Sequence, residues 1–392
     1  MRAPSTEAAS GQPRPAGSEA LSGSGRPTTA RIDLNALSHN FREAMRRAAG
    51  RKILAVVKAG AYGHGAVPVS RHLLGMGASM LGVALVEEGK ELRAAGIEAP
   101  VLVMGGVVPG QAEAIVSLGL TPVVFTRTFG RALSEAARRR GTKVPVHVKI
   151  DTGMGRIGVP PEAAPALIEE LRSFDGIEVE GLMMHFAEAD LKDKRFAAEQ
   201  VARFEDLLKK LADKGIEVPL RHAANSAAVL DYERALFTMV RPGLMLYGYN
   251  PLEGDQSGAG LRPVLSLVTH IAFLKKVPAG TPISYGRTFV TGRESLIATI
   301  LIGYADGYNR GLSNKGQALV RGRRVPVTGR VCMDMCMLDV TDVPGVSEGD
   351  EVVLIGQQGS ERITADEIAQ ATGTIAYEVL CGISSRVPRI TI

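Results

Sequence analysis

Short apolar runs rich in β-branched residues alternate with amphipathic, helix-like stretches from residue 53 to about residue 248. Short apolar runs of this kind are typical of strands buried on both faces, and the stretches between them are long enough for helices. Eight strand–helix repeats predict an α/β fold of the (β/α)8-barrel type. The eight runs are 53–57, 80–85, 100–104, 121–125, 144–150, 178–185, 220–224 and one near 239–246.

The pattern changes after about residue 262, where apolar runs are separated by glycine and proline turns. This punctuation is typical of a mainly β domain. Only residues 364–372 have helical spacing there, with Thr364 as the expected N-cap and Glu367 three positions later. The apolar runs of this part are 266–274, 295–302, 317–322 and 350–356.

These patterns predict three parts of the chain. Residues 1–29 are rich in Ala, Gly, Ser and Pro without an apolar block, which predicts a disordered tail. Residues 30–261 are expected to form the barrel, and residues 262–392 the mainly β domain. The tail lacks the apolar core of a signal peptide, so we expect a cytoplasmic protein.

Composition excludes several classes of protein. Of the 392 residues, 45% are hydrophobic and 22% charged, as in ordinary soluble domains. No apolar run approaches the roughly 18–20 residues of a membrane span. The net charge of +5 is not gathered into a basic stripe with interleaved aromatics, so we expect no nucleic-acid partner.

The three cysteines, Cys332, Cys336 and Cys381, are an odd count that favours a reducing compartment over a disulfide framework. The spacing of the first two does not suit a zinc knuckle. We therefore interpret them as buried thiols and expect no metal site.

Barrel enzymes build their sites at the carboxyl ends of the strands, and polar residues follow several of the predicted strands. Each residue alone has an ordinary explanation, such as a histidine satisfied in the core or Ser226 as a helix N-cap. Their shared placement on one rim is what indicates a site. These residues are Lys58, Tyr62, Lys149, Arg156, His185, Asn225, Ser226, Arg241 and Gly243.

Lys58 ends an apolar strand and enters a glycine-rich turn. A lone lysine at a strand end is most often one that reaches solvent with its amine. A lysine held away from solvent can instead form a Schiff base. Glycines with hydroxyl and N–H donors suit a phosphate, and barrels often bind phosphate after strands seven and eight. A phosphate and a reactive lysine together suggest pyridoxal phosphate (PLP).

The chain resembles alanine racemase, a PLP enzyme of fold type III, from about Ala30 to its C-terminus. The resemblance rests on many motifs in the same order, which is far more specific than any single one. They are AVVKAGAYGHG, KIDTGMGRIG, MMHFAEAD, AANSAAVL, MVRPGLMLYG, PISYGRTF, ILIGYADGYNRGL, VTGRVCMDMCMLDV and ISSRVPRI.

The resemblance implies that Lys58 binds PLP covalently and then serves as the base on the D face of the substrate. It implies that Tyr285 is the base on the L face, donated by the partner subunit of a homodimer. By itself, Tyr285 would read as an ordinary turn tyrosine. The expected product is D-alanine, used for peptidoglycan.

Further roles follow from the same resemblance. Arg241 is expected to face the pyridine nitrogen, with His185 and His222 linking it toward Tyr285. Arg156 is expected to bind the substrate carboxylate beside Lys149, which in the family is often carbamylated. The remaining expected positions are Tyr62, Asn225, Ser226, Gly243 and Leu244 around the cofactor, Met333 on the substrate carboxylate from the second subunit, and Tyr304, Arg310, Arg330, Asp334 and Asp190 along an access corridor.

One residue departs from the family pattern. Ser385 stands where the last family motif usually has a tyrosine that helps hold the phosphate and crowds the substrate side chain. This leaves a broader serine or amino-acid racemase as an alternative. A barrel PLP decarboxylase would need a cysteine-centred site, and a single-domain PLP-binding protein would lack residues 262–392. Neither fits the sequence as well.

Overall fold

The computed structural model describes residues 25–254 and 260–392, so most of the predicted tail at 1–29 lies outside the described residues. The chain forms two compact units. The barrel unit contains Ile32–Leu265 and Thr391–Ile392, and the second unit contains Ser266–Ile390 together with the chain up to Arg31. Arg26 and Thr28 already make hydrogen bonds within the second unit.

The barrel unit has a parallel sheet in the order β8-β7-β6-β5-β4-β3-β2-β9. The sheet nearly closes between its two ends, where the N–H of Arg241 donates to the carbonyl of Ala224 at 2.9 Å. The predicted (β/α)8 barrel is therefore confirmed. Its strands are β2 (Lys52–Val56), β3 (Met80–Val83), β4 (Val101–Val103), β5 (Thr121–Val124), β6 (Val144–Lys149), β7 (Ile177–Met183), β8 (Leu220–His222) and β9 (Met239–Val240).

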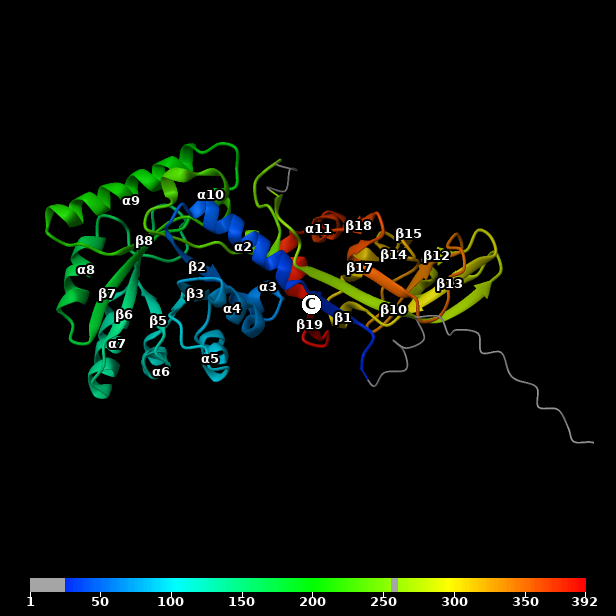
Figure 1. Ribbon diagram of the computed structural model, residues 1–392, viewed down its shortest axis with the longest axis horizontal. Helices are drawn as coiled ribbons and strands as arrows, with labels where there is room; N and C mark the ends of the chain where they lie inside the picture. The colour runs from blue at the N-terminus through cyan, green and yellow to red at the C-terminus, as the bar shows by residue number, and fades with distance from the viewer. Residues whose placement is uncertain (1–24, 255–259) are drawn as a thin grey trace, which may run out of the picture. The chain divides into compact units, whose positions relative to one another are not determined.

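Helices follow the strands and cover the outside of the barrel (Figure 1). The longest, α9, buries Ala197, Val201, Phe204 and Leu207 at the three- and four-residue spacing of an amphipathic helix. No helix in the described ranges is both long and apolar enough to span a bilayer. The helices of this unit are α2 (Leu34–Ala48), α3 (Lys58–Tyr62), α4 (Ala66–Gly75), α5 (Val86–Ala94), α6 (Ala112–Ser117), α7 (Arg127–Arg140), α8 (Ala164–Ser173), α9 (Arg195–Asp213) and α10 (Ser226–Asp231).

The last barrel strand is shorter than the apolar run predicted. Only Met239–Val240 pairs with β2, and the chain then continues as a short 3-10 helix at Leu244–Tyr247. Pro242 and Gly243 stand between these elements, and a proline cannot donate to a strand ladder. The turn brings the Gly243 backbone to the carboxyl end of the barrel.

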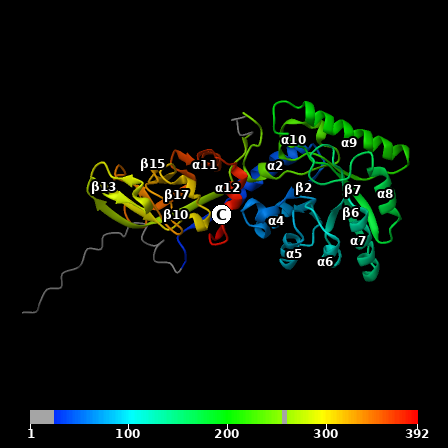
Figure 2. The ribbon, with the colours of Figure 1, turned by 180° about the vertical axis from the view of Figure 1, so that it is seen from behind.

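The second unit is built mainly of antiparallel strands, as predicted. Its central path runs β15-β14-β17-β10-β1-β19, and β13 and β16 continue from β10. Figure 2 shows these strands from behind. They are β1 (Thr29–Ile32), β10 (Leu265–Val277), β11 (Pro282–Ile283), β12 (Phe289–Val290), β13 (Ser295–Ile300), β14 (Gln317–Val320), β15 (Arg323–Pro326), β16 (Cys336–Asp339), β17 (Glu351–Gln358), β18 (Glu361–Ile363) and β19 (Arg389–Thr391).

The expectation of a single helix in this unit is wrong. The predicted helix is present as α11 (Ala365–Thr372), and the Thr364 hydroxyl accepts from the N–H of Glu367 as a cap. A second helix, α12 (Ala376–Gly382), follows it. Its N-cap residue, Ile375, has no side-chain acceptor, so the sequence lacks the usual start signal.

Candidate functional site

Lys58 stands at the carboxyl end of β2 and begins an unusual turn. The next four residues, Ala59, Gly60, Ala61 and Tyr62, all have positive φ angles between 52° and 62°. A left-handed conformation costs a residue with a β-carbon about 1–2 kcal/mol, and such residues usually occur singly. Strain of this kind persists only where surrounding contacts hold it, and it is concentrated at functional sites.

Glu88 on α5 provides such a contact. One oxygen of its carboxylate accepts from the N–H of Ala59 at 2.6 Å, and the other accepts from the N–H groups of Ala84 and Leu85. The carboxylate thus ties the turn after Lys58 to the turn after β3. The sequence analysis missed Glu88, which resembles any acidic residue in the first turn of a helix.

A compact group of donors lies where β2, α10 and the turn after β9 meet. The Ser226 hydroxyl accepts from the N–H groups of Gly243 at 2.9 Å and Met245 at 3.2 Å. A β-carbon built at Gly243 would lie 2.7 Å from the Tyr62 hydroxyl, so only glycine allows this approach. Asn225 caps α10 by accepting from the N–H of Ala228. Leu244 follows Gly243 directly at the start of the 3-10 helix.

Arg241 is 3% exposed, and acceptors surround its two terminal nitrogens. Nη1 donates to the carbonyl of His222 at 2.7 Å, and Nη2 donates to the carbonyls of Met184 and Ala223, both at 2.9 Å. The Nδ1 atoms of His222 and His185 lie 3.1 and 3.2 Å from these nitrogens. Among the described residues none accepts from Nε, which leaves one N–H of the guanidinium available. Burial lowers the pKa of Arg241 to about 9.

The two histidines predicted beside Arg241 are both in contact with it. Burial, followed by the charges of Arg241 and Lys149, lowers the pKa of His185 well below its ordinary value. Burial and the neighbouring His147 do the same for His222. Both rings are therefore neutral near pH 7, because protonation would add charge to a site that is already positive.

Lys149, at the end of β6, has an amine that is buried without a hydrogen-bond partner among the described residues. Burial first, and then the charges of Arg241 and Arg156, lower its pKa well below the ordinary value. An unprotonated buried amine with no partner is costly, because its polar atom has lost water and gained nothing in return. The charge of Arg156 is thus one of those that disfavour protonation of Lys149.

The barrel site has more positive than negative charge. The charges of Lys58, Arg156 and Arg241 all lower the pKa of His185, and Arg241 also contacts its ring. Asp151 partly offsets Lys149, but the N–H groups of Gly153, Met154 and Gly155 already hold its carboxylate. Across the described parts of the chain, no group of His, Cys, Asp and Glu side chains could hold a metal ion. The surplus of positive charge and N–H donors fits an anionic ligand.

Of the other predicted residues, Asp190 belongs to the barrel unit, where its carbonyl accepts from the N–H of Glu253 at 2.9 Å, and the rest belong to the second unit. Tyr285 is 71% exposed and follows Ser284, whose φ of 65° makes a sharp turn. The N–H of Tyr304 donates to the carbonyl of Cys332 at 3.0 Å, and that of Ala305 donates to Met333 at 3.1 Å. The loops that carry Tyr304 and Met333 are thus bonded to each other.

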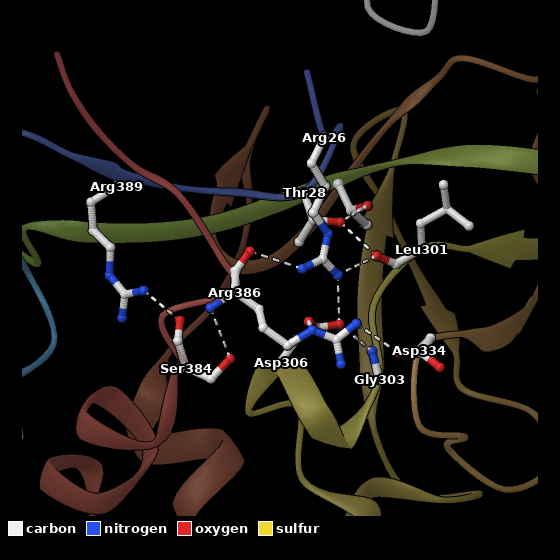
Figure 3. A network of polar contacts seen from close by, with 10 residues as sticks. Arg26, Thr28, Leu301, Gly303, Asp306, Asp334, Ser384, Arg386 and Arg389 are labelled. Carbon is white, nitrogen blue, oxygen red and sulfur yellow. Dashed lines mark hydrogen bonds and ion pairs between the residues drawn. The ribbon is translucent and has the colours of Figure 1, made fainter. Parts of the chain in front are cut away.

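A buried carboxylate, Asp306, fixes these loops (Figure 3). Its Oδ2 accepts from the N–H of Gly303 at 3.0 Å and pairs with Arg26 at 2.7 Å. Its Oδ1 lies 3.3 Å from Nε of Arg386, whose Nη2 also contacts Asp334 at 2.7 Å. The sequence analysis named Asp334 but missed Asp306, Arg26 and Arg386, which lie far apart along the chain.

Comparison with known proteins gives the family of the chain. Residues 32–251 match the model of the alanine racemase N-terminal domain, and residues 264–391 match that of its C-terminal domain. The chain is 49% identical to the alanine racemase of Halothermothrix orenii, over 93% of this chain and 96% of that protein. It is 51% identical to alanine racemase 2 of Caldanaerobacter subterraneus subsp. tengcongensis, over 94% and 95% of the two chains.

The chain belongs to the alanine racemase family. A solved alanine racemase from Clostridium difficile 630 superposes with a TM-score of 0.90 at 38% identity, covering 93% of this chain and 96% of that one. The resemblance drawn from the sequence motifs is confirmed, as is the fold of a barrel followed by a mainly β domain. Alanine racemases are isomerases that depend on PLP, and the chain is an enzyme of this family.

Proposed function

We propose that the chain interconverts L-alanine and D-alanine with PLP held in the barrel. The observation that carries the proposal is that Lys58, Arg241 and the bonded pair Ser226–Gly243 all follow strands at the carboxyl end of the barrel, where positive charge is in excess. PLP has an anionic phosphate, an aldehyde and a pyridine nitrogen. The barrel offers a group for each of these: N–H and hydroxyl groups for the phosphate, the Lys58 amine for the aldehyde, and the Nε–H of Arg241 for the pyridine nitrogen.

Bound PLP withdraws electrons from the substrate and so acidifies the proton on its α-carbon. The chain's own residues then decide where that proton goes. The amine of Lys58 takes or returns it on the D face, and the phenol of Tyr285, supplied by the partner subunit of a homodimer, does so on the L face. Two proton carriers on opposite faces are what racemisation requires.

Arg241 and the groups around it hold the cofactor ring. The Nε–H of Arg241 would donate to the pyridine nitrogen, and the arginine, remaining charged, would keep that nitrogen unprotonated. The phosphate would be held by Tyr62, Asn225, Ser226, Gly243 and Leu244. His185 and His222 hold the guanidinium, and His185 continues toward Tyr285.

The substrate carboxylate is bound by Arg156 and by the N–H of Met333 from the partner subunit. Lys149 is the remaining difficulty, since its buried amine lies beside two cations. Its reaction with carbon dioxide would form a carbamate and release a proton. The resulting anion would pair with Arg156 and satisfy the unpartnered nitrogen. Tyr304 and Asp334 line the access corridor.

The setting of the reaction follows from the same proposal. We place the enzyme in the cytoplasm as a homodimer that supplies D-alanine for peptidoglycan. Its partners are alanine and a second copy of the chain. Neither a nucleic acid nor a membrane is needed.

The test removes each proton carrier in turn. Lys58→Ala should lower racemisation by about 10³-fold and should lose the lysine that borohydride labels. It should keep solvent deuterium exchange from L-alanine, whereas Tyr285→Phe should keep exchange from D-alanine. Lys90→Ala, on the exposed face of α5, is the matched control and should behave as the native protein.

Labelling of a lysine other than Lys58 would overturn the proposal. Full racemisation by a dimer-breaking variant would overturn the role of Tyr285 in the partner subunit. The opposite pattern of exchange in the two variants would reverse the assignment of faces.

Ser385 leaves a second candidate, a racemase that also accepts serine-sized substrates. Its side chain is exposed in the second unit and is much shorter than the tyrosine of the family pattern. Ser385→Tyr should lower the ratio of kcat/KM for serine over alanine by about tenfold, because it fills the space beside the substrate side chain. Equal ratios in both proteins would remove this candidate.

A further inference from the structure

Four side chains form a line through the interior of the barrel, from Glu180 on β7 to Arg241 after β9. Nε2 of His147 lies 3.8 Å from an oxygen of Glu180. Nδ1 of His147 lies 2.7 Å from Nε2 of His222, and Nδ1 of His222 lies 3.1 Å from Nη1 of Arg241. His147, His222 and Arg241 are all buried. Neither the sequence analysis nor the proposed function gives His147 or Glu180 a role.

The sheet makes room for this line. His147 pairs with Gly181 across β6 and β7, and a β-carbon at Gly181 would lie 2.5 Å from the His147 ring. Any other residue at Gly181 would displace the imidazole. The next strand places His222 beside Met183, so the three strands present the side chains in order.

The direction of the hydrogen bonds follows from the donors available. Arg241 can only donate, so Nδ1 of His222 must be an acceptor. A neutral imidazole carries one proton, which then lies on Nε2 of His222 and is donated to Nδ1 of His147. His147 must in turn carry its proton on Nε2, which has no hydrogen-bond partner among the described residues and lies toward Glu180.

The charges support this order. Burial lowers the pKa of His147, as it does that of His222, so both rings are neutral near pH 7. The contact with His147 holds the pKa of Glu180 below its ordinary value, so its carboxylate is an anion. At 3.8 Å this last contact is electrostatic and not a direct hydrogen bond. A cation and an anion thus end a chain of two neutral rings, all polarised the same way.

We propose that His147 and Glu180 are positioning residues that act on Arg241 through His222. They fix the proton of His222 on Nε2, which keeps Nδ1 open as an acceptor for the guanidinium. This bond helps keep Arg241 charged. It also orients the guanidinium so that its Nε–H is left for a ligand. With the opposite tautomer, an N–H of His222 would face an N–H of Arg241, and the guanidinium would have to move.

The importance of the line for PLP rests on the proposed function, but the direction of its hydrogen bonds does not. The first experiment therefore observes the native protein. Long-range ¹H–¹⁵N correlation spectra of the holoenzyme, with histidine labelled in ¹⁵N, report which ring nitrogen carries the proton. We expect the Nε2–H form for both His147 and His222. An Nδ1–H or doubly protonated form of either ring would overturn the proposal.

The second experiment compares matched variants. His147→Phe removes the acceptor for His222 and should weaken PLP binding to the apoprotein and lower kcat by about tenfold each, with KM little changed. His147→Gln can accept from His222 and donate toward Glu180, and should restore both values to within about threefold. Glu180→Gln should give a smaller loss of the same kind. Glu178→Gln, on the exposed face of the same strand, should have no effect.

Native PLP affinity and kcat in a folded His147→Phe protein would overturn the proposal, as would failure of His147→Gln to restore either. If His147→Phe does not fold, the spectrum of the native protein and the His147→Gln and Glu180→Gln pair still decide. If Lys58→Ala remained an active racemase, the proposed function would fail, yet the tautomers of the two histidines would stand as measured.

Discussion

Arg241 in the barrel and Asp306 in the second unit are both shielded from solvent, but they are satisfied differently. Two arginines face the Asp306 carboxylate, whose Oδ2 also accepts from a backbone N–H, and Asp334 pairs with one of these arginines. Arg241 contacts only carbonyls and neutral histidines, and the nearest carboxylate of its line, Glu180, lies beyond two rings. The Asp306 cluster thus balances two arginines with two carboxylates, whereas Arg241 keeps a charge and an unused donor.

The difference between the two sites lies in whether a buried charge is balanced by its neighbours in the protein. A buried ion is costly unless it is paired, so a purely structural site balances its charges. Asp306 does so and thereby fixes the loops of Tyr304 and Met333. Arg241 does not, since carbonyls and neutral rings surround it without a paired carboxylate, and its unused N–H can bind a ligand. The following three changes test this difference.

The largest expected effect comes from opening the closed cluster. Asp306→Ala leaves the N–H of Gly303 without its acceptor and removes the carboxylate that Arg26 and Arg386 face. It should lower the free energy of unfolding of the second unit by about 3 kcal/mol. The chain has no tryptophan, so Phe273→Trp on β10 provides a fluorescent reporter for urea unfolding.

Asp342→Ala serves as the control, because its ion pair with Arg293 is largely exposed. It should change stability by less than about 1 kcal/mol. Similar losses of unfolding free energy in the Asp306 and Asp342 variants would show that burial of the Asp306 cluster does not matter. The contrast between Asp306 and Arg241 would then fail.

The sequence predicted most of the barrel because most of its strands are apolar runs, buried by the barrel interior on one face and by helices on the other. It pointed to Lys58, Lys149 and His185 because they stand at the ends of those runs, and their roles remain predictions. It could not predict the left-handed turn after Lys58, since Ala59, Ala61 and Tyr62 are ordinary helix residues and only Gly60 hints at positive φ.

Contacts between distant parts of the chain were also beyond the sequence. Arg26, Asp306 and Arg386 are separated by 80 residues or more, and nothing local marks any of them as a partner of the others. His147 sits within an alternating strand pattern, where its inward direction and the space left by Gly181 become visible only once β6 and β7 are paired.

The open cluster can be tested with a simple anion. Inorganic phosphate at a hundredfold excess over its Kd should stabilise the apoprotein's barrel by about 2.7 kcal/mol, because it binds the folded state alone. A Phe174→Trp reporter on the barrel would record the shift in thermal unfolding. Tyr62→Phe removes a hydroxyl beside Gly243 and should reduce the shift, while Tyr232→Phe should not.

Chloride at equal ionic strength should not reproduce the stabilisation, since it cannot accept several hydrogen bonds at once. If phosphate stabilised the Phe273→Trp reporter of the second unit as much as the barrel reporter, the positive charge of the barrel would not be the cause.

The smallest expected effect, counted for each titrating side chain, is the change in stability as the pH falls. Burial lowers the pKa of His147, His185 and His222, so these rings stay neutral in the folded barrel when the unfolded chain binds protons near pH 6.5. Below that pH the unfolded state holds more protons, and the barrel loses up to about 1.4 kcal/mol per pH unit for each such histidine. His147→Gln should reduce this slope by the share of one proton.

Asp306 affects stability only at a lower pH than the histidines do. Burial alone would raise its pKa, but the Arg26 ion pair and the Gly303 N–H outweigh it and hold the pKa below 3.8. Its contribution is therefore complete above pH 3.8 and is lost only as the pH falls through that lower value. Between about pH 6.5 and 3.8 the stability measured with the Phe174→Trp reporter should fall, while the contribution of the Asp306 cluster should stay constant. If stability fell equally steeply with pH in the native and His147→Gln proteins, His147 would have to be protonated in the folded state. The proposed line of two neutral histidines between Arg241 and Glu180 would then be wrong.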